Sequence, residues 1–199
     1  MSEIPLTGGD MNVVVRVGDT VRRPPEPRGV QALLRWYEQV GFDGAPRFLG
    51  VDEQGREVLS FVEGEPAFAP VPCSDEVVAA IGRLLRRAHD AQAGFAPPAD
   101  AGWLQRAEGQ PEVVGHLDLF WTNVVFRDGL PAALIDWEIA APAPRTLEVA
   151  LAATYWPASG STRSSRSGAS RSDAAASGSA SSATPTGSTP GSGARCSTR

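Results

Sequence analysis

Four side chains with catalytic or chelating groups lie close together between residues 115 and 140. His116, Asp118 and Asn123 stand at the spacing H-x-D-x-x-x-x-N, directly before a short apolar run. Asp136 ends the next apolar run, and the Arg-Asp-Gly sequence between the two runs predicts a hairpin turn. The four groups are therefore expected at one end of a β-hairpin.

The chemistry of this set follows from its oxygen atoms. Counting from the hairpin tip pairs Asn123 with about Leu134, so Asp136 lies about two residues, or roughly 7 Å, farther along the strand. An amide oxygen and a carboxylate are hard ligands that suit Mg²⁺, which takes its other ligands from phosphates and water. Asp118 lies on the preceding loop, where a carboxylate can accept the proton of an incoming hydroxyl.

Two other interpretations of the same residues stay open. His116, Asp118 and Asp136 could surround a transition metal in a hydrolase, although the chain has only two histidines. They could also be satisfied polar residues of a turn. Glu138 either assists the metal site or is a solvated carboxylate, and His89 ends an amphipathic run, where a packed or capping role is expected.

The first third of the chain predicts a small β-rich lobe with one helix. Two short apolar runs flank a turn at Gly18-Asp19, which is typical of a hairpin. Residues 29–40 place Val30, Leu33, Leu34, Tyr37 and Val40 on one helical face, and Gly41 ends the helix. Residues 46–64 read as two strands around a turn at residues 53–55.

Helices are predicted on both sides of the catalytic hairpin. The run from Ser74 to Ala91 opens with an N-cap serine and an acidic first turn, and its apolar residues form one stripe. Residues 147–155 also show helical spacing. The strands and helices together predict an α+β fold.

The composition changes abruptly after Pro157. Residues 158–199 contain Ser, Gly, Ala, Arg, Thr and Pro but no large apolar residue, so they are expected to be disordered. Such a composition is typical of GC-rich DNA translated in a shifted frame, which we take as the first interpretation. A flexible linker or an arginine-bearing tail is the alternative.

Charge and composition argue against several classes of partner. A net charge of -5 and the lack of a basic run in the first 150 residues predict no nucleic-acid partner. No apolar run approaches the roughly 20 residues that span a bilayer, and the N-terminus does not resemble a signal peptide. The two cysteines, Cys73 and Cys196, suit a reducing compartment, so a cytoplasmic location is expected.

The motifs together resemble those of the aminoglycoside phosphotransferase family, which are small-molecule kinases with a protein-kinase-like fold. The resemblance covers about residues 6–156 and includes the runs "EVLSFVEGE", "LLRRAHD", the loop from His116 and "LIDWE". It implies a bilobal fold with a nucleotide-binding lobe at 1–62, a partial and mainly helical catalytic lobe at 63–157, and a tail at 158–199.

The resemblance also implies roles for individual residues. Asp118 would be the catalytic base, His116 would steady its loop, and Asn123 and Asp136 would hold Mg²⁺. The nucleotide, ATP or GTP, would contact a glycine pair, a strand arginine in place of the family's lysine, and the segment after the second hairpin: Gly8, Gly9, Arg22, Phe61 and Val62.

Two functions follow from these implied roles. One is the Mg²⁺-assisted transfer of a phosphoryl group from ATP to the hydroxyl of a small molecule, aminoglycoside-like or other. The other is a catalytically impaired kinase-like binding or immunity protein. The chain has no lysine and lacks the family's final helices, which keeps the second function open.

Overall fold

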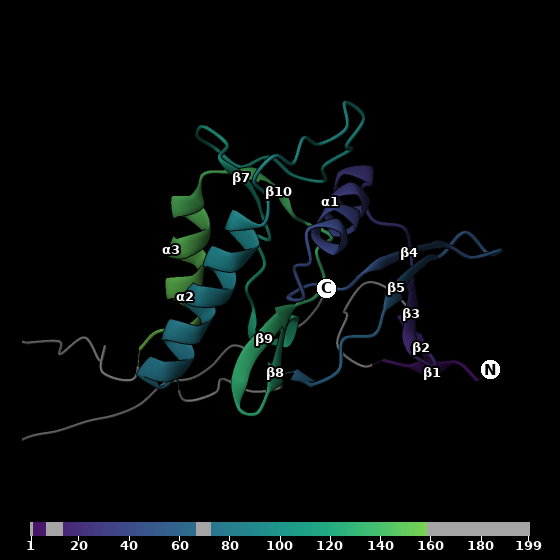
Figure 1. Ribbon diagram of the computed structural model, residues 1–199, viewed down its shortest axis with the longest axis horizontal. Helices are drawn as coiled ribbons and strands as arrows, with labels where there is room; N and C mark the ends of the chain where they lie inside the picture. Colours follow the sequence, from purple (N-terminus) through teal and green to yellow (C-terminus); the bar gives the residue numbers. More distant parts are fainter. Residues whose placement is uncertain (1, 7–13, 67–72, 159–199) are drawn as a thin grey trace, which may run out of the picture. The chain divides into compact units, whose positions relative to one another are not determined.

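A computed structural model describes residues 2–6, 14–66 and 73–158, all within one compact unit. An antiparallel five-stranded sheet occupies the N-terminal part of this unit, in the order β1-β2-β3-β5-β4 (Figure 1). Its strands are β1 (Ile4–Pro5), β2 (Val15–Val17), β3 (Thr20–Arg23), β4 (Phe48–Val51) and β5 (Glu57–Ser60). The hairpin predicted around Gly18 is confirmed, since Val17 pairs with Thr20 and Gly18 has a φ of 60°.

One helix, α1 (Arg28–Gln39), lies between β3 and β4 in the chain and contacts β4. Its apolar face is buried at Val30, Leu33, Leu34 and Tyr37. Val40, which the sequence placed on the same face, is 44% exposed because the helix has already ended. Gly41 follows with a φ of 75°, a conformation that costs glycine little and so ends the helix there.

Two helices lie side by side in the second half of the described chain, α2 (Asp75–Asp90) and α3 (Arg145–Tyr155). The predicted cap of α2 is confirmed, because the hydroxyl oxygen of Ser74 accepts a hydrogen bond from the Val77 amide at 3.3 Å. The remaining elements are β6 (Glu65–Pro66), β7 (Val113–Gly115), η1 (Trp121–Asn123), β8 (Val124–Arg127), β9 (Leu130–Leu134) and β10 (Ala141–Ala143).

The hairpin of β8 and β9 lies between Asn123 and Asp136 in the chain. Its turn has positive φ angles at Asp128 and Gly129, 52° and 76°. A bulge between Val125 and Phe126 shifts the register by one residue, so Val124 pairs with Leu134. The predicted pairing of Asn123 with Leu134 is therefore wrong by one position. The Ile135 amide donates to the Asn123 carbonyl at 2.9 Å, so Asp136 lies one residue, not two, beyond the position opposite Asn123.

Helix α1 is tied to the second half of the unit by buried polar contacts. The Tyr37 hydroxyl donates to the Ala88 carbonyl at 3.2 Å and accepts from the Gln92 amide at 2.8 Å. The Tyr37 ring also meets the Trp137 ring edge-on, with 5.5 Å between centroids. These contacts join α1 to the segment just after β9, so the two halves share one core.

The α+β fold predicted from the sequence is confirmed. The lobe boundary after residue 62 stays a prediction, because the residues on both sides of it belong to one compact unit. The predicted disordered tail begins at the last described residue, Ala158, and otherwise lies outside the described residues.

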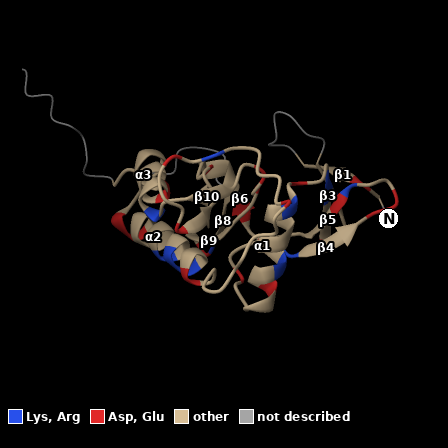
Figure 2. Cartoon of the chain, turned by 90° about the horizontal axis from the view of Figure 1, so that it is seen from above, with Lys and Arg blue, Asp and Glu red and all other residues tan. Residues whose placement is uncertain are grey.

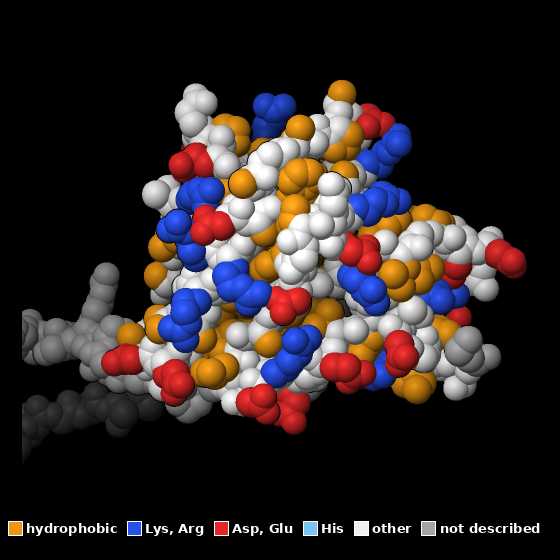
Figure 3. All heavy atoms as spheres, in the orientation of Figure 1, with side chains coloured by type: hydrophobic (Ala, Val, Ile, Leu, Met, Phe, Trp, Pro, Cys, Tyr) orange, Lys and Arg blue, Asp and Glu red, His pale blue; other side chains and the backbone are white. Residues whose placement is uncertain are grey.

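Acidic and basic side chains are interspersed along the described elements (Figure 2). The face shown in Figure 3 likewise mixes arginines, carboxylates and apolar side chains. No helix within residues 2–6, 14–66 and 73–158 has both the length and the apolar character needed to cross a membrane. The absence of a nucleic-acid partner and the cytoplasmic location stay predictions.

Candidate active site

A pocket of about 400 Å³ lies between the five-stranded sheet and the β8–β9 hairpin. Four of the residues predicted for nucleotide or metal binding line it, namely Phe61, Val62, Asn123 and Asp136. The apolar part of its wall includes Val21, Leu59, Val125 and Ile135. Gly8 and Gly9, predicted to contact the nucleotide, lie outside the described residues.

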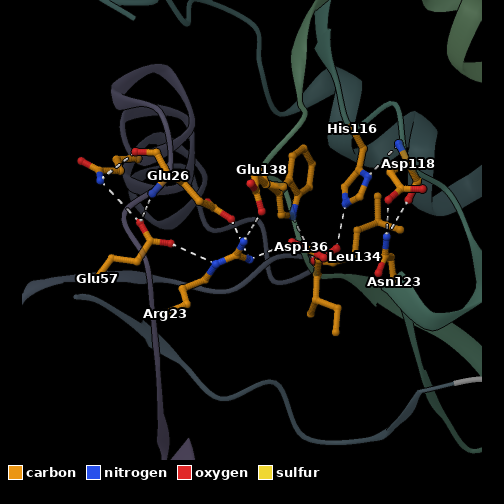
Figure 4. Close-up of polar contacts among 12 residues, drawn as sticks. Arg23, Glu26, Glu57, His116, Asp118, Asn123, Leu134, Asp136 and Glu138 are labelled. Atoms are coloured by element: carbon orange, nitrogen blue, oxygen red, sulfur yellow. Dashed lines mark hydrogen bonds and ion pairs between the residues drawn. The ribbon is translucent and has the colours of Figure 1, made fainter. Parts of the chain in front are cut away.

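The loop that carries Asp118 is held next to Asn123. The side-chain amide of Asn123 donates to the Asp118 carboxylate at 2.9 Å and to the Asp118 backbone carbonyl at 3.2 Å (Figure 4). Leu117, between His116 and Asp118, has a φ of 63°, which is rare for a side chain of its size. The Asp118 carboxylate is thus oriented by its own loop and by the last residue of η1.

His116 links this loop to the end of β9. Its Nε2 donates to the Ile135 carbonyl at 2.8 Å, and its Nδ1 accepts from the Asp118 amide at 3.3 Å, which assigns the proton to Nε2. Burial lowers the pKa of the His116 ring, so the neutral form predominates at neutral pH. The Trp137 ring lies edge-on to it, 4.6 Å between centroids. These contacts suit a residue that steadies the loop.

Asp136 and Asn123 each offer an oxygen toward the pocket. Asp136 has a φ of 63°, and its side chain is 42% exposed. One of its carboxylate oxygens accepts from Arg23 at 2.8 Å, while the other has no hydrogen bond from any residue that the structure describes. The amide nitrogen of Asn123 donates to Asp118, and among the described residues the amide oxygen of Asn123 accepts only from the Thr122 hydroxyl, at 3.4 Å. An amide oxygen and a half-exposed carboxylate fit a hard cation such as Mg²⁺.

The arginine that reaches this pocket is Arg23, not Arg22. Neighbouring strand residues point to opposite faces, and Arg23 shares with Val21 the face that lines the pocket. The Arg22 guanidinium instead donates to the Thr20 hydroxyl at 2.6 Å and lies 3.7 Å from Asp52. The structure therefore does not bring Arg22 together with the other predicted site residues, and sequence reasoning missed Arg23 by one position.

Arg23 is surrounded by four carboxylates (Figure 4). Its guanidinium lies 2.8 Å from both Asp136 and Glu138, 2.9 Å from Glu26 and 3.8 Å from Glu57. Glu26 and Glu57 are buried, and burial raises the pKa of both carboxyl groups, that of Glu26 to about 8. A protonated Glu26 reduces the excess of negative charge around a single buried arginine at neutral pH.

This raised pKa predicts a pH-dependent stability. The folded chain keeps a proton on Glu26 that the unfolded chain loses above its ordinary pKa of 4.5, so the free energy of unfolding should fall between about pH 4.5 and 8. Glu26→Gln, which cannot ionise, should remove about 1–3 kcal/mol of that decline. Thermal unfolding of both proteins across this range measures it.

The exposed turn residue Glu53 supplies the matched control. Glu53→Gln should leave the pH profile of the wild-type protein in place. Parallel profiles for Glu26→Gln and the wild type would show that Glu26 ionises normally in the folded chain.

Comparisons with known proteins agree with this geometry. Residues 99–166 match the model of the phosphotransferase enzyme family, and this range contains His116, Asp118, Asn123 and Asp136. Residues 99–166 are therefore similar to the segment of the phosphotransferase enzyme family that includes the predicted catalytic loop, and the resemblance predicted from the sequence is confirmed.

A particular relative is the trifolitoxin immunity protein of Rhizobium leguminosarum bv. trifolii. It is 45% identical over 159 residues, which cover 75% of this chain and 60% of the relative. The chain thus spans less than two thirds of the length of this curated relative.

Solved structures of kinases share the fold at low sequence identity, which confirms the kinase-like fold predicted from the sequence. A choline/ethanolamine kinase family protein from Mesorhizobium loti is 19% identical with a TM-score of 0.51, over 75% of this chain and 62% of that one. The gentamicin complex of APH(2″)-IIa is 11% identical with a TM-score of 0.52, over 74% and 68% of the two chains. The GDP complex of a mutant aminoglycoside 2′-phosphotransferase-IIIa is 15% identical with a TM-score of 0.50, over 77% and 71%.

Proposed function

We propose that this chain transfers the terminal phosphoryl group of ATP, or GTP, to the hydroxyl of a small molecule. One observation carries the proposal: Asn123 lines the same pocket as Asp136, Phe61 and Val62, and it is hydrogen-bonded to Asp118. A candidate general base, two candidate metal ligands and an apolar wall for the purine ring of the nucleotide therefore meet at one place. The phosphotransferase-family match over this segment supports it.

Each residue has a defined part in such a reaction. Asp118 accepts the proton of the acceptor hydroxyl as the new oxygen–phosphorus bond forms and the bond to the β-phosphate oxygen breaks. His116, neutral and buried, holds the Asp118 loop against Ile135. Asn123 and Asp136 would hold Mg²⁺, which when bound neutralises phosphate charge and orients the transferred group.

The remaining pocket residues fit the nucleotide. Val21, Leu59 and Ile135 offer apolar surface to a purine ring, and Phe61 and Val62 contribute the segment along which the family resemblance places the base. Arg23 supplies the cation next to Asp136 that a polyphosphate needs. The nucleotide-bound state of a fold relative, the GDP complex, supports nucleotide use by this pocket.

The two neighbouring arginines give a direct test of the nucleotide assignment. Arg23→Gln should weaken Mg²⁺-ATP binding about tenfold or more, because it removes a charged contact from the pocket. Arg22→Gln, one position away on the other face of β3, should change the affinity less than about twofold. Calorimetry on both variants measures the difference.

A third variant controls for the possibility that Arg23→Gln unfolds the protein. Arg23→Lys keeps a positive charge among the four carboxylates and should retain most of the affinity. If Arg22→Gln and Arg23→Gln lost the same amount of Mg²⁺-ATP affinity, neither arginine could be assigned the phosphate contact.

A separate observation supports a second function. The relative that is 45% identical to this chain is named as an immunity protein. We infer as the alternative that this chain keeps the kinase-like fold and contributes to immunity by binding, without turnover.

Phosphorus NMR separates the two functions. The wild-type protein is incubated with Mg²⁺-ATP and a hydroxyl acceptor, either gentamicin, which one fold relative binds, or choline, for which the family of another is named. A phosphotransferase produces ADP and a new phosphomonoester signal only when Mg²⁺ is present. Saturable nucleotide binding with an unchanged ATP spectrum across all acceptors would favour the binding protein.

A further inference from the structure

Residues 101–105, in the loop between α2 and β7, contact two segments that lie far apart in the chain. We call this stretch the bridging segment. Its Ala101 carbonyl accepts a hydrogen bond from the Gly29 amide in the first turn of α1, at 2.7 Å. The side-chain amide of Gln105 donates to the Ile139 carbonyl at 2.6 Å. The bridging segment therefore joins the start of α1 to the stretch that follows β9.

The contact with α1 requires a glycine. Helix α1 begins after Pro27, which offers no side-chain cap, so the Ala101 carbonyl pairs with one of the helix amides that have no partner within the helix. The Trp103 ring lies directly over Gly29, and a Cβ atom on this residue would come within 2.4 Å of the ring. Glycine weakens a helix, but here it lets the ring approach the backbone. The bridging segment therefore holds the start of α1 in place.

Both of the joined segments carry a carboxylate that contacts Arg23. Glu26 directly precedes the N-cap residue of α1, and its carboxylate lies 2.9 Å from the Arg23 guanidinium. Glu138 directly precedes Ile139, and its carboxylate lies 2.8 Å from the same guanidinium. Figure 4 shows both carboxylates pointing toward Arg23. A shift of either segment would therefore move an ion-pair partner of the pocket arginine.

The direction of the Arg23 guanidinium depends on these two partners. An arginine side chain has several rotatable bonds, so strand β3 alone does not fix its far end. Glu26 contacts Nη1 of the guanidinium, and Glu138 contacts Nη2. Because the guanidinium is planar, holding two of its nitrogens also fixes the orientation of its plane. The spacing between the two carboxylate-bearing segments therefore sets how Arg23 faces the pocket.

We propose that Trp103 and Gln105 position Arg23: they hold the start of α1 and the stretch after β9 at the spacing at which both carboxylates reach the guanidinium. Neither Trp103 nor Gln105 lines the described pocket, so both act through Arg23 and not by touching the nucleotide. The effect on nucleotide affinity rests on the proposed function, whereas the orientation of Arg23 can be observed without it.

Two substitutions and two matched controls form the test. Trp103→Ala removes the ring that packs on α1, and Gln105→Met keeps the length of the side chain but cannot donate a hydrogen bond. Trp36→Ala controls for the loss of a partly buried tryptophan, because Trp36 packs near the other end of α1. Gln110→Met controls for the loss of a side-chain amide, because Gln110 is exposed in the same loop outside the bridging segment.

The first readout is the nitrogen NMR spectrum of the Arg23 guanidinium, recorded without nucleotide on protein that contains isotope-labelled arginine. Hydrogen-bonded ion pairs slow the rotation of the two Nη groups, so the wild type should give separate Nη signals for Arg23, assigned by their loss in Arg23→Gln. Trp103→Ala and Gln105→Met should each merge these signals, and both controls should keep them separate. Gln105→Met, a substitution at an exposed position, carries the test if Trp103→Ala does not fold.

The second readout is Mg²⁺-ATP affinity, measured by calorimetry. Trp103→Ala should weaken binding about fivefold or more and Gln105→Met about threefold, whereas each control should change it less than about twofold. In the Arg23→Gln protein, Trp103→Ala should cause no further loss, because its effect acts through Arg23. A general loss of stability would instead add to the loss caused by Arg23→Gln.

The outcomes separate this proposal from the proposed function. Merged Arg23 signals in the wild type or in the controls, separate signals in either folded test variant, or additive losses of affinity in the double variant would overturn the positioning role. A wild-type protein that binds no Mg²⁺-ATP would instead overturn the proposed function, and the Arg23 spectrum would still decide the role of the bridging segment.

Discussion

Asp118→Asn is expected to remove at least about 99% of phosphoryl transfer, because a positioned general base contributes about 10²-fold or more. The substitution should leave the thermal midpoint nearly unchanged, since the asparagine oxygen can still accept the hydrogen bond that Asn123 donates at 2.9 Å. Initial rates with Mg²⁺-ATP and thermal unfolding measure the two quantities.

Asp128→Asn is the matched control for Asp118. Asp128 lies in the β8–β9 turn with a φ of 52°, a conformation that asparagine adopts readily, and it is exposed. The Asp128→Asn variant should retain both phosphoryl transfer and thermal stability. A large loss of stability at Asp118→Asn together with retained transfer would make Asp118 a structural loop residue.

Asp136→Ala is expected to abolish the Mg²⁺ dependence of nucleotide binding. Asp136 supplies the only candidate carboxylate ligand that lines the described pocket, and Mg²⁺ bound to ATP gains its protein contacts through one or two such groups. Calorimetric titration with ATP, with and without Mg²⁺, measures the dependence directly. The same Mg²⁺-ATP affinity before and after the change would make the metal assignment wrong.

The backbone at Asp136 requires a second variant. Its φ of 63° favours asparagine over alanine, so Asp136→Ala also introduces backbone strain of about 1 kcal/mol. Asp136→Asn keeps this conformation and removes only the charge. Loss of the Mg²⁺ effect in both variants, with the asparagine variant as stable as the wild type, would assign the effect to the carboxylate.

The local parts of the site could be predicted from the sequence. Asn123 and Asp136 flank one hairpin, whose turn residues and apolar runs are all within a short stretch. Even there the bulge after Val125 moved the register by one residue, because a bulge depends on how two strands twist together. The spacing H-x-D indicated the loop but not the positive φ at Leu117.

The parts that depend on distant segments could not be predicted. Which of Arg22 and Arg23 faces the pocket depends on how β3 sits between β2 and β5. Glu57 meets Arg23 only because β3 and β5 pair along their whole length. The contact between His89 and Glu148 joins residues 59 positions apart. One signal was present: an acidic residue follows Leu147 inside a predicted apolar helix.

A structure of the protein with Mg²⁺ and a non-hydrolysable ATP analogue tests the central claim most directly. We expect the purine ring of the nucleotide against Phe61 and Val62, the metal between the Asn123 oxygen and the Asp136 carboxylate, and the phosphates within reach of Arg23. A nucleotide bound elsewhere on the protein, or bound in this pocket with its metal away from both Asn123 and Asp136, would contradict it.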